Sequence, residues 1–254
     1  MKKLIAMNGV GFGYPGQAPI LSRINFEVVQ GEQILILGPN GSGKSTMALL
    51  IAGLLAPTSG MIYRNNILSA IGIVFQNSRH QMVGSTVEDD LAFGLSLKNL
   101  TIIEIKNTID YFLERFNLTS KRHYNINQLS GGELRRLALA SVLITDPQIL
   151  ILDEPLAMLD KKSQLSFLEC LLENIKPETT VIWYDHEVRS IRYTEKWMVL
   201  NKNGELNQVS LDELNSKTFL TENSLTPAPL QILEWELPNR ISCSIFGPER
   251  IKFD

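Results

Sequence analysis

The residues best suited to do chemistry lie at positions 38–46, which read GPNGSGKST. This segment matches G-x-x-x-x-G-K-[S/T], the pattern of a phosphate-binding P-loop. Glycines let backbone N–H groups converge on an anion, and the helix that follows adds partial positive charge. Lys44 can reach the β- and γ-phosphates, and the Ser45 hydroxyl can bind Mg²⁺. The positions expected to contact the nucleotide are Asn40, Gly41, Ser42, Gly43, Lys44, Ser45 and Thr46.

The segments on either side of this loop support that interpretation. Residues 34–37 (ILIL) form an apolar run directly before it, and a helical pattern spans residues 46–55 directly after it. A P-loop requires this order of strand, loop and helix. The alternative is an ordinary glycine-rich turn, which the flanking pattern disfavours.

A second segment, residues 149–154, reads ILILDE and pairs an apolar strand with two acids at its end. Asp153 would then hold the Mg²⁺ shell, and Glu154 would polarise the attacking water. The alternative is a buried strand followed by a solvated acidic turn. The P-loop upstream favours the catalytic interpretation.

The third segment, residues 129–133, reads LSGGE. Ser130 can cap a helix whose N–H groups face an anion, and Gly131 and Gly132 let a phosphate approach closely. A plain helix start is the alternative. Here the sequence resembles the ATP-binding cassette (ABC) family, whose signature is LSGGQ or LSGGE. The resemblance implies that two such domains sandwich two Mg-ATP molecules, and that this loop contacts the γ-phosphate bound to the partner's P-loop.

Four further positions match the family pattern in its order. The resemblance implies that Tyr14 stacks on adenine. It places Gln76 near Mg²⁺, where it also takes part in catalysis. Asp160 matches an aspartate at the dimer interface, although Ala157 stands where the family commonly has serine. His186 ends an apolar strand and matches the histidine that contacts the γ-phosphate.

Residues 75–94, which read FQNSRHQMVGSTVEDDLAFG, are similar to the corresponding segment of energy-coupling-factor (ECF) transporter ATPases. The resemblance implies that a transmembrane coupling protein docks near Gln76–Gly94 and that its arginines meet Glu88, Asp89 or Asp90. The same acids also suit the first turn of a helix. The sequence leaves open whether the chain pairs with a copy of itself or with a homologous subunit.

The apolar segments predict an α/β fold. Continuous apolar strands alternate with helices, which indicates a parallel sheet covered on both faces. The resemblance implies a P-loop NTPase core with an N-terminal antiparallel β-subdomain and an inserted helical subdomain at about 77–146. We expect one ABC ATPase domain over 1–225 and a short tail over 226–254, with a β-like end at 240–245. A buried helical stripe is predicted from Ile102, Ile103, Ile105, Ile109, Phe112, Leu113 and Phe116.

Composition and charge limit the classes of partner that we expect this chain to bind. The 254 residues carry a formal net charge of −3, and lysines and arginines form no cluster, which disfavours nucleic-acid binding. No apolar run approaches the length of a membrane span, so any membrane role is expected to come through a partner. We therefore expect peripheral association with the cytoplasmic face of the cell membrane.

The resulting hypothesis is an ATP-hydrolysing subunit that energises an ECF-type importer of vitamins or transition-metal ions. The expected partners are a second ATPase subunit, the coupling protein and, indirectly, a substrate-binding membrane protein. One alternative is the ATPase subunit of a non-ECF ABC transporter. Another is a soluble ABC ATPase acting on DNA or ribosomes, although such proteins usually carry a coiled-coil insertion or two cassettes. Residues 201–204 (NKNG) superficially match a base-reading motif of GTPases, and we interpret them as a hairpin turn.

Overall fold

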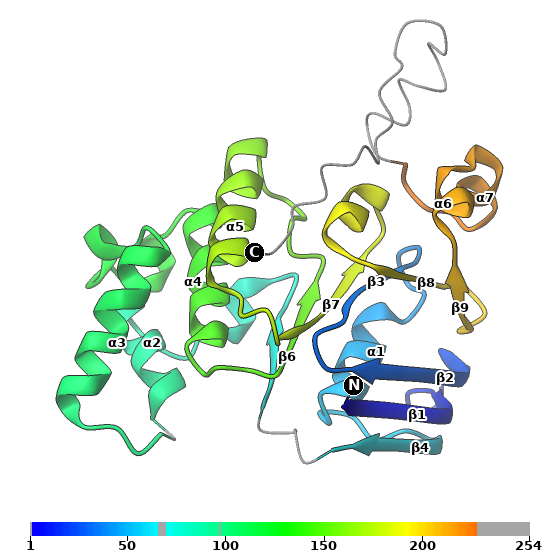
Figure 1. The fold of residues 1–254 in the computed structure, drawn as a ribbon, viewed down its shortest axis with the longest axis horizontal. Coiled ribbons are helices and arrows are strands. Elements are labelled where there is room, and N and C mark those ends of the chain that lie inside the picture. Colours follow the sequence, from blue (N-terminus) through cyan, green and yellow to red (C-terminus); the bar gives the residue numbers. More distant parts are fainter. Residues whose placement is uncertain (1, 66–69, 97, 228–254) are drawn as a thin grey trace, which may run out of the picture. The chain divides into compact units, whose positions relative to one another are not determined.

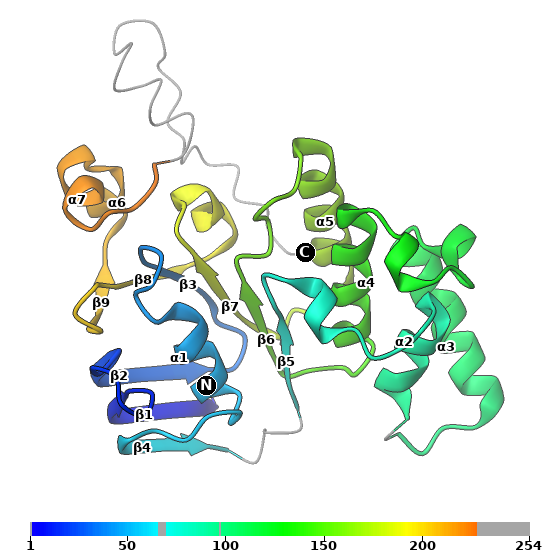
Figure 2. The same cartoon turned by 180° about the vertical axis from the view of Figure 1, so that it is seen from behind.

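The computed structural model describes residues 2–65, 70–96 and 98–227. Backbone contacts divide the chain into two compact units. The first comprises Met1–Leu68 and Thr180–Asp254, and the second comprises Ser69–Thr179. Figure 1 and Figure 2 show the chain from opposite sides. The fold is α/β, as predicted, with both parallel and antiparallel strand pairs.

The first unit contains a three-stranded antiparallel sheet. Its central strand β1 (Lys3–Phe12) pairs with β2 (Leu21–Val29) on one side and β4 (Ser59–Arg64) on the other. From Leu21 to Val28 of β2 the apolar side chains are buried and the polar ones between them are exposed or half-buried, with Phe26 only 4% exposed. This alternation is typical of a sheet with a single buried face.

The first unit also contains the parallel strands that carry the P-loop. Strand β3 (Gln33–Leu37) lies between β7 (Thr180–Asp185) and β8 (Lys196–Leu200), parallel to both. Strand β9 (Leu206–Val209) is antiparallel to β8, and the turn that joins them is the predicted hairpin. Residues 34–37 of β3 are fully buried, as expected of a strand covered on both faces.

The P-loop leads from β3 into helix α1 (Lys44–Ile51). The sequence predicted a helix that continues to residue 55, but α1 ends four residues earlier. Gly53 has a φ of 77°, the left-handed conformation that terminates many helices. The remaining helices of this unit are the 3-10 helix η5 (Val188–Tyr193), α6 (Leu211–Asn215) and α7 (Lys217–Glu222).

The second unit is built on two parallel strands, β5 (Ile71–Val74) and β6 (Ile149–Asp153), with Ile73 opposite Ile151. Strand β6 is the one predicted from the apolar run at 149–152. Its helices are α2 (Val87–Leu95), α3 (Ile102–Arg115), α4 (Gly131–Leu143), α5 (Lys161–Asn174) and the 3-10 helices η2 (Ser78–Gln81), η3 (Thr119–Lys121) and η4 (Ile126–Gln128).

The buried stripe predicted for α3 is correct only in its C-terminal half. Ile109, Leu113 and Phe116 are at most 3% exposed, whereas Ile102 is 86% and Ile103 is 72% exposed. Ile103 precedes Ile109 by six residues, which places it about 120° away around the helix axis. Ile102 precedes Ile109 by seven residues and so lies on nearly the same side of the helix, yet it is exposed, so the buried stripe does not extend to the first turn of α3.

The predicted domain boundaries, 1–225 with a helical subdomain at about 77–146, remain predictions. Nearly all of the predicted tail, including its β-like end at 240–245, lies outside the described residues. Among the described residues, no helix is both long enough and apolar enough to cross a membrane.

Candidate active site

The P-loop leaves the N-terminus of α1 available to a ligand. Gly43 precedes α1 with a φ of 99°, and no side chain caps the helix. Every other α-helix of the described residues has a side-chain N-cap. Uncapped N–H groups and the helix dipole together favour an anion. The start of α1 is therefore arranged for an acceptor that the chain itself does not supply.

Glycine is required at two positions of this loop for different reasons. A Cβ on Gly43 would lie 2.7 Å from Cγ2 of Ile20, so the loop packs too closely for a side chain there. Gly41 has a φ of 81°, and a Cβ built on it would meet nothing within 4 Å. Gly41 thus provides the turn and leaves open space above it, which suits a bulky ligand.

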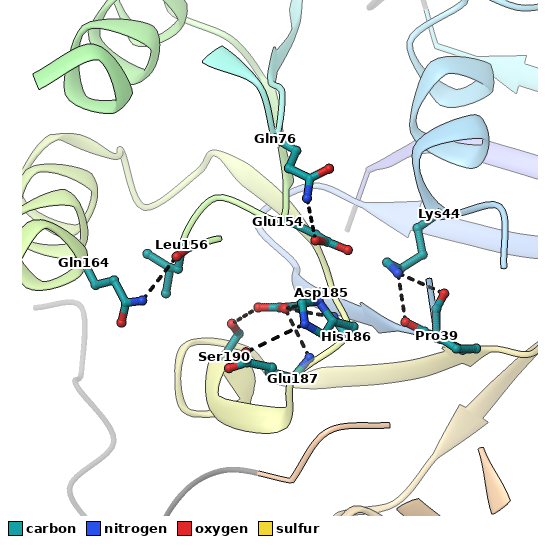
Figure 3. Close-up of polar contacts among 11 residues, drawn as sticks. Pro39, Lys44, Gln76, Glu154, Leu156, Gln164, Asp185, His186, Glu187 and Ser190 are labelled. Carbon is teal, nitrogen blue, oxygen red and sulfur yellow. Dashed lines mark hydrogen bonds and ion pairs between the residues drawn. The ribbon is translucent and has the colours of Figure 1, made fainter. Parts of the chain in front are cut away.

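Three polar side chains of the loop, those of Ser42, Lys44 and Thr46, are buried. Lys44 is 5% exposed, and its Nζ donates to Gly38 O at 2.8 Å and Pro39 O at 3.1 Å (Figure 3). Ser42 is 2% exposed, and its Oγ has no hydrogen-bond partner among the described residues. Such a hydroxyl is costly unless a ligand completes it. The loop therefore fits a phosphate group, and the exposed Ser45 hydroxyl fits a cation bound beside it.

His186 lies at the same edge of the first unit as the P-loop. Leu37 is opposite Asp185 where β3 and β7 end, and Gly38 N donates to Asp185 O at 3.1 Å. The buried Asp185 carboxylate accepts from His186 N at 2.8 Å and Ser190 Oγ at 2.8 Å (Figure 3). The fold thus brings the predicted histidine to the carboxyl ends of the strands that hold the P-loop.

Tyr14 lies in a turn of the same unit. Its ring meets Phe12 edge to face, with centroids 5.0 Å apart and planes at 88°. Gln17 N donates to Tyr14 O at 3.0 Å and closes the turn. The contact with Phe12 fixes the orientation of the Tyr14 ring, and stacking on adenine remains a prediction.

In the second unit the acidic pair ends β6, as predicted. Asp153 is 5% and Glu154 8% exposed. Glu154 has a φ of 45°, a left-handed conformation that costs a side-chain-bearing residue about 1–2 kcal/mol. Gln76 Nε2 donates to Glu154 Oε2 at 3.0 Å (Figure 3). Strain of this kind persists where the surroundings fix the backbone, often at functional sites.

The signature loop, residues 129–133, forms a complete N-cap for α4. Ser130 Oγ accepts from Glu133 N at 3.3 Å, and Glu133 Oε2 accepts from Ser130 N at 2.8 Å. Partial burial raises the pKa of Glu133, but the bonds from Ser130 outweigh it and hold that pKa below its usual value. A Cβ on Gly132 would lie 2.6 Å from Ser163 Oγ, whereas one on Gly131 would meet nothing. Only Gly131 therefore leaves open space for a ligand.

Asp160 caps the neighbouring helix α5. Its Oδ1 accepts from Ser163 N at 2.8 Å, and this hydrogen bond lowers the pKa of the Asp160 carboxyl. Met158, two residues earlier, is 96% exposed with a φ of 60°. The starts of α4 and α5 thus present Ser130, Gly131 and Asp160 to solvent.

Two residues of the site were not predicted. Asp185, which fixes His186, carried a signal in the sequence, because an acid at the end of a buried strand is a common helper of a following histidine. Arg135 carried none beyond its place in a helix that also holds Arg136. It is 6% exposed and donates to the main chain of Phe75 and Gln76.

The predicted role of Asp90, one of the three acids in α2, needs correction. Asp90 is 4% exposed, its Oδ1 accepts from the backbone N–H groups of Val83 and Gly84, and its Oδ2 accepts from Ser141 Oγ at 2.6 Å. A buried carboxylate with three donors cannot receive a partner's arginine, so the prediction for Asp90 is wrong. The alternative interpretation, an acid within a helix start, is the correct one.

The other two acids of α2 also have contacts within the chain. Glu88 pairs with Arg122 at 2.5 Å, which lowers the pKa of the Glu88 carboxyl. Asp89 completes the cap of α2, because its Oδ2 accepts from Thr86 N at 3.0 Å. Only Asp89 of the three is exposed.

Comparison with known proteins supports the same conclusion as the motifs. Residues 21–157 match the family described as ABC transporter. The chain is 34% identical over 233 residues to the energy-coupling factor transporter ATP-binding protein EcfA1 of Mycoplasmoides gallisepticum, covering 87% of this chain and 84% of that protein. It is 37% identical over 227 residues to EcfA1 of Streptococcus pyogenes, covering 84% and 81%.

Solved structures give a consistent result. The fold is similar to CbiO1 of Clostridium perfringens, described as part of the ABC transporter complex CbiONQ, with a TM-score of 0.75, 28% identity and coverage of 94% and 97%. It is also similar to the dimeric bacterial ABC transporter cassette MJ0796, with a TM-score of 0.73, 28% identity and coverage of 82% and 99%.

The contacts of Asp90 and Asp89 predict different costs of removal. Asp90→Ala leaves buried N–H and hydroxyl donors unpaired, so it should lower the free energy of unfolding by about 2–4 kcal/mol. Asp89→Ala removes half of an exposed capping box and should cost about 1 kcal/mol or less. Urea unfolding of both variants measures the difference. Equal losses in the two variants would contradict the structural role of Asp90.

Proposed function

This chain belongs to the ABC transporter family, in the branch of the energy-coupling factor transporter ATP-binding proteins, and we propose that it drives an ECF-type importer of vitamins or transition-metal ions. The observation that carries the proposal is the bond from Gln76 to Glu154. It joins the segment expected to receive a membrane partner to the residue expected to activate water. In this proposal, the bond lets a partner bound at that segment act directly on the residue that activates water.

In the proposed site the P-loop holds the triphosphate. The uncapped N–H groups of α1 and the loop amides at positions 40–43 point positive charge at the phosphates. Lys44 exchanges its carbonyl partners for phosphate oxygens, and Ser42 Oγ gains a partner that it lacks among the described residues. Thr46 extends the set of donors, and Tyr14 supports the adenine.

The donor set also fits Mg²⁺. Ser45, Asp153 and Gln76 offer a hydroxyl, a carboxylate and an amide oxygen, the hard oxygen ligands that this ion prefers. When bound, the ion neutralises charge on the phosphate oxygens. We propose that these three residues hold it.

Hydrolysis transfers the γ-phosphoryl group to water. Glu154 accepts a hydrogen bond from the attacking water and draws its proton as the new oxygen–phosphorus bond forms. The bond to the bridging oxygen of ADP breaks, and ADP and phosphate leave. Lys44 and His186 stabilise the charge that spreads over the γ-phosphate oxygens. Asp185 keeps the His186 backbone in place during this step.

A second subunit completes each site. We propose that Ser130 and Gly131 contact the γ-phosphate bound to the P-loop of a partner ATPase, with Asp160 at the same interface. Two observations support this: Gly131 has open space where a side chain would be, and the similar cassette MJ0796 is dimeric. The partner is a copy of this chain or a homologous subunit.

We propose that the coupling protein docks near Gln76–Gly94, at the cytoplasmic face of the membrane. Because the α2 acids have partners within the chain, apolar side chains provide the main contact in this proposal. Val83 is 61% exposed and Phe93 57% exposed in this segment. The substrate-binding membrane protein is then reached only through the coupling protein.

The test of the proposed function is the variant Glu154→Gln, which keeps the shape of the side chain and removes its basicity. ATP turnover should fall about 10²–10⁴-fold, because the water loses its base. ATP should still bind and hold two subunits together. ATPase assays and size-exclusion chromatography with Mg-ATP measure both effects. Undiminished ATP turnover in Glu154→Gln would contradict the role of Glu154 as the base.

Lys44→Ala should weaken nucleotide binding itself. Loss of a charged hydrogen bond to phosphate corresponds to about a 10–100-fold increase in Kd for ATP. Titration with a fluorescent ATP analogue gives the value, and Lys98→Ala serves as the control for removal of a lysine outside the site. An unchanged Kd in Lys44→Ala would refute phosphate contact by Lys44.

The docking proposal predicts that Val83→Ser with Phe93→Ser releases the chain from its membrane partner. Fewer apolar contacts should reduce co-purification of the coupling protein, while ATP-dependent pairing of the ATPase subunits persists. Ile103→Ser, on the exposed first turn of α3, is the matched control. Equal co-purification of the double variant and the control would rule out this surface.

A further inference from the structure

Arg135 makes an unusual set of contacts for a residue in the middle of a helix. Its Nη1 donates to Phe75 O at 2.7 Å, and its Nη2 donates to Gln76 O at 2.6 Å. A longer contact of 3.5 Å joins Nη2 to Ala157 O. The guanidinium of Arg135 thus contacts two segments of main chain. One is residues 75–76, and the other is Ala157, three residues after Glu154.

These contacts fix the backbone that aims Gln76 at Glu154. The Gln76 carbonyl is held by Arg135 while the Gln76 amide donates to Glu154 Oε2 at 3.0 Å. Gln81 adds a second restraint, because its Oε1 accepts from Phe75 N at 2.9 Å and its Nε2 donates to Ala138 O on α4. The N–H group and the carbonyl of Phe75 are therefore both hydrogen-bonded to side chains that belong to α4 or are bonded to it.

The backbone beyond Glu154 is restrained from the same helix. Ala157 N donates to Glu154 O at 3.1 Å and closes the turn that contains the left-handed Glu154. The Ala157 carbonyl faces Arg135. A single side chain of α4 therefore contacts both the segment that carries the amide and the segment that carries the acid.

Only arginine suits this position. A guanidinium presents several N–H donors in one plane, whereas a lysine ammonium is a compact point charge on a flexible stem. Burial holds the pKa of Arg135 below its usual value, and the charge of Asp153 offsets part of that shift. A buried cation is costly, and its cost here is offset by carbonyl partners next to the catalytic pair.

Arg136, the next residue along α4, makes hydrogen bonds to partners other than Gln76 and Glu154. Arg136 Nε donates to Phe116 O at 3.0 Å, and its Nη1 donates to Ser166 Oγ at 3.4 Å. Both partners lie away from Gln76 and Glu154 in the second unit, at the ends of α3 and within α5. Arg136 thus provides a matched control on the same helix.

We propose that Arg135 is a positioning residue for ATP hydrolysis, which holds the main chain at Phe75–Gln76 so that the Gln76 amide engages Glu154. The inference rests on the proposed ATPase function and on the role of Glu154 in it. Ser130 caps the start of the same helix, so α4 carries both the signature loop and the Arg135 side chain that holds Phe75–Gln76.

A double-mutant cycle between Arg135→Ala and Gln76→Ala, with kcat for ATP as the readout, tests the proposal. Each single variant of the chain, assayed with its membrane partners, should lower kcat by about 10²-fold, with KM for ATP little changed. Because Arg135 acts through Gln76, the double variant should also lose about 10²-fold and not the product. Arg135→Lys should recover part of the rate, since one ammonium makes fewer of the contacts.

Arg136→Ala is the control and should lower the melting temperature while leaving kcat unchanged. If Arg135→Ala does not fold, the cycle of Arg135→Lys with Gln76→Ala provides the same comparison. If the losses of kcat multiply in the double variant, or if folded Arg135→Ala has the kcat of the wild type, the inference about Arg135 is overturned. The proposed ATPase function is not affected by either result. A wild-type chain without ATPase activity would overturn the proposed function and this inference with it.

Discussion

A triphosphate can be held only by N–H groups and cations that the fold has not already committed to stronger partners. This constraint explains why one helix of the chain differs from the rest. Side chains cap every other described α-helix, four of them with a complete capping box, whereas α1 begins at a left-handed glycine with no cap. An uncapped end forgoes about 1 kcal/mol of stability, which a bound phosphate restores. In the proposed function, a phosphate bound at the start of α1 therefore takes the place of the missing side-chain cap.

The second unit holds Glu154, the proposed base, and the Gln76 amide in a fixed relation. Glu154 adopts a backbone conformation that is strained for its residue type, and Gln76 comes from a loop with little regular structure of its own. Both need support from elsewhere, and α4 supplies it through the side chain of Arg135. The same helix begins at the signature loop. In the proposed function, α4 thus connects the residue that activates water with the loop that contacts a second nucleotide.

The sequence predicted the parts of the fold and of the site that depend on local pattern. Apolar periodicity and fixed spacing predicted the strands β3, β6 and β7 and the nucleotide motifs. Apart from the early end of α1 before Gly53, the errors concern tertiary contacts, which spacing does not encode. Asp90 and Asp89 look alike in sequence, yet only Asp90 is buried against Ser141, a residue 51 positions away. Arg135 and Arg136 are likewise adjacent, and only the fold shows that Arg135 reaches the main chain of Gln76.

The most direct test of the account concerns what surrounds the γ-phosphate. The complex purified from its native membranes can be trapped with ADP and orthovanadate, which mimics the transferring phosphoryl group, and then irradiated so that vanadate cleaves the adjacent backbone. Our account predicts cleavage within both residues 38–46 and residues 129–133, because the P-loop and the signature loop of a partner meet at the same phosphate. Cleavage confined to residues 38–46, with ADP and vanadate still trapped, would contradict it.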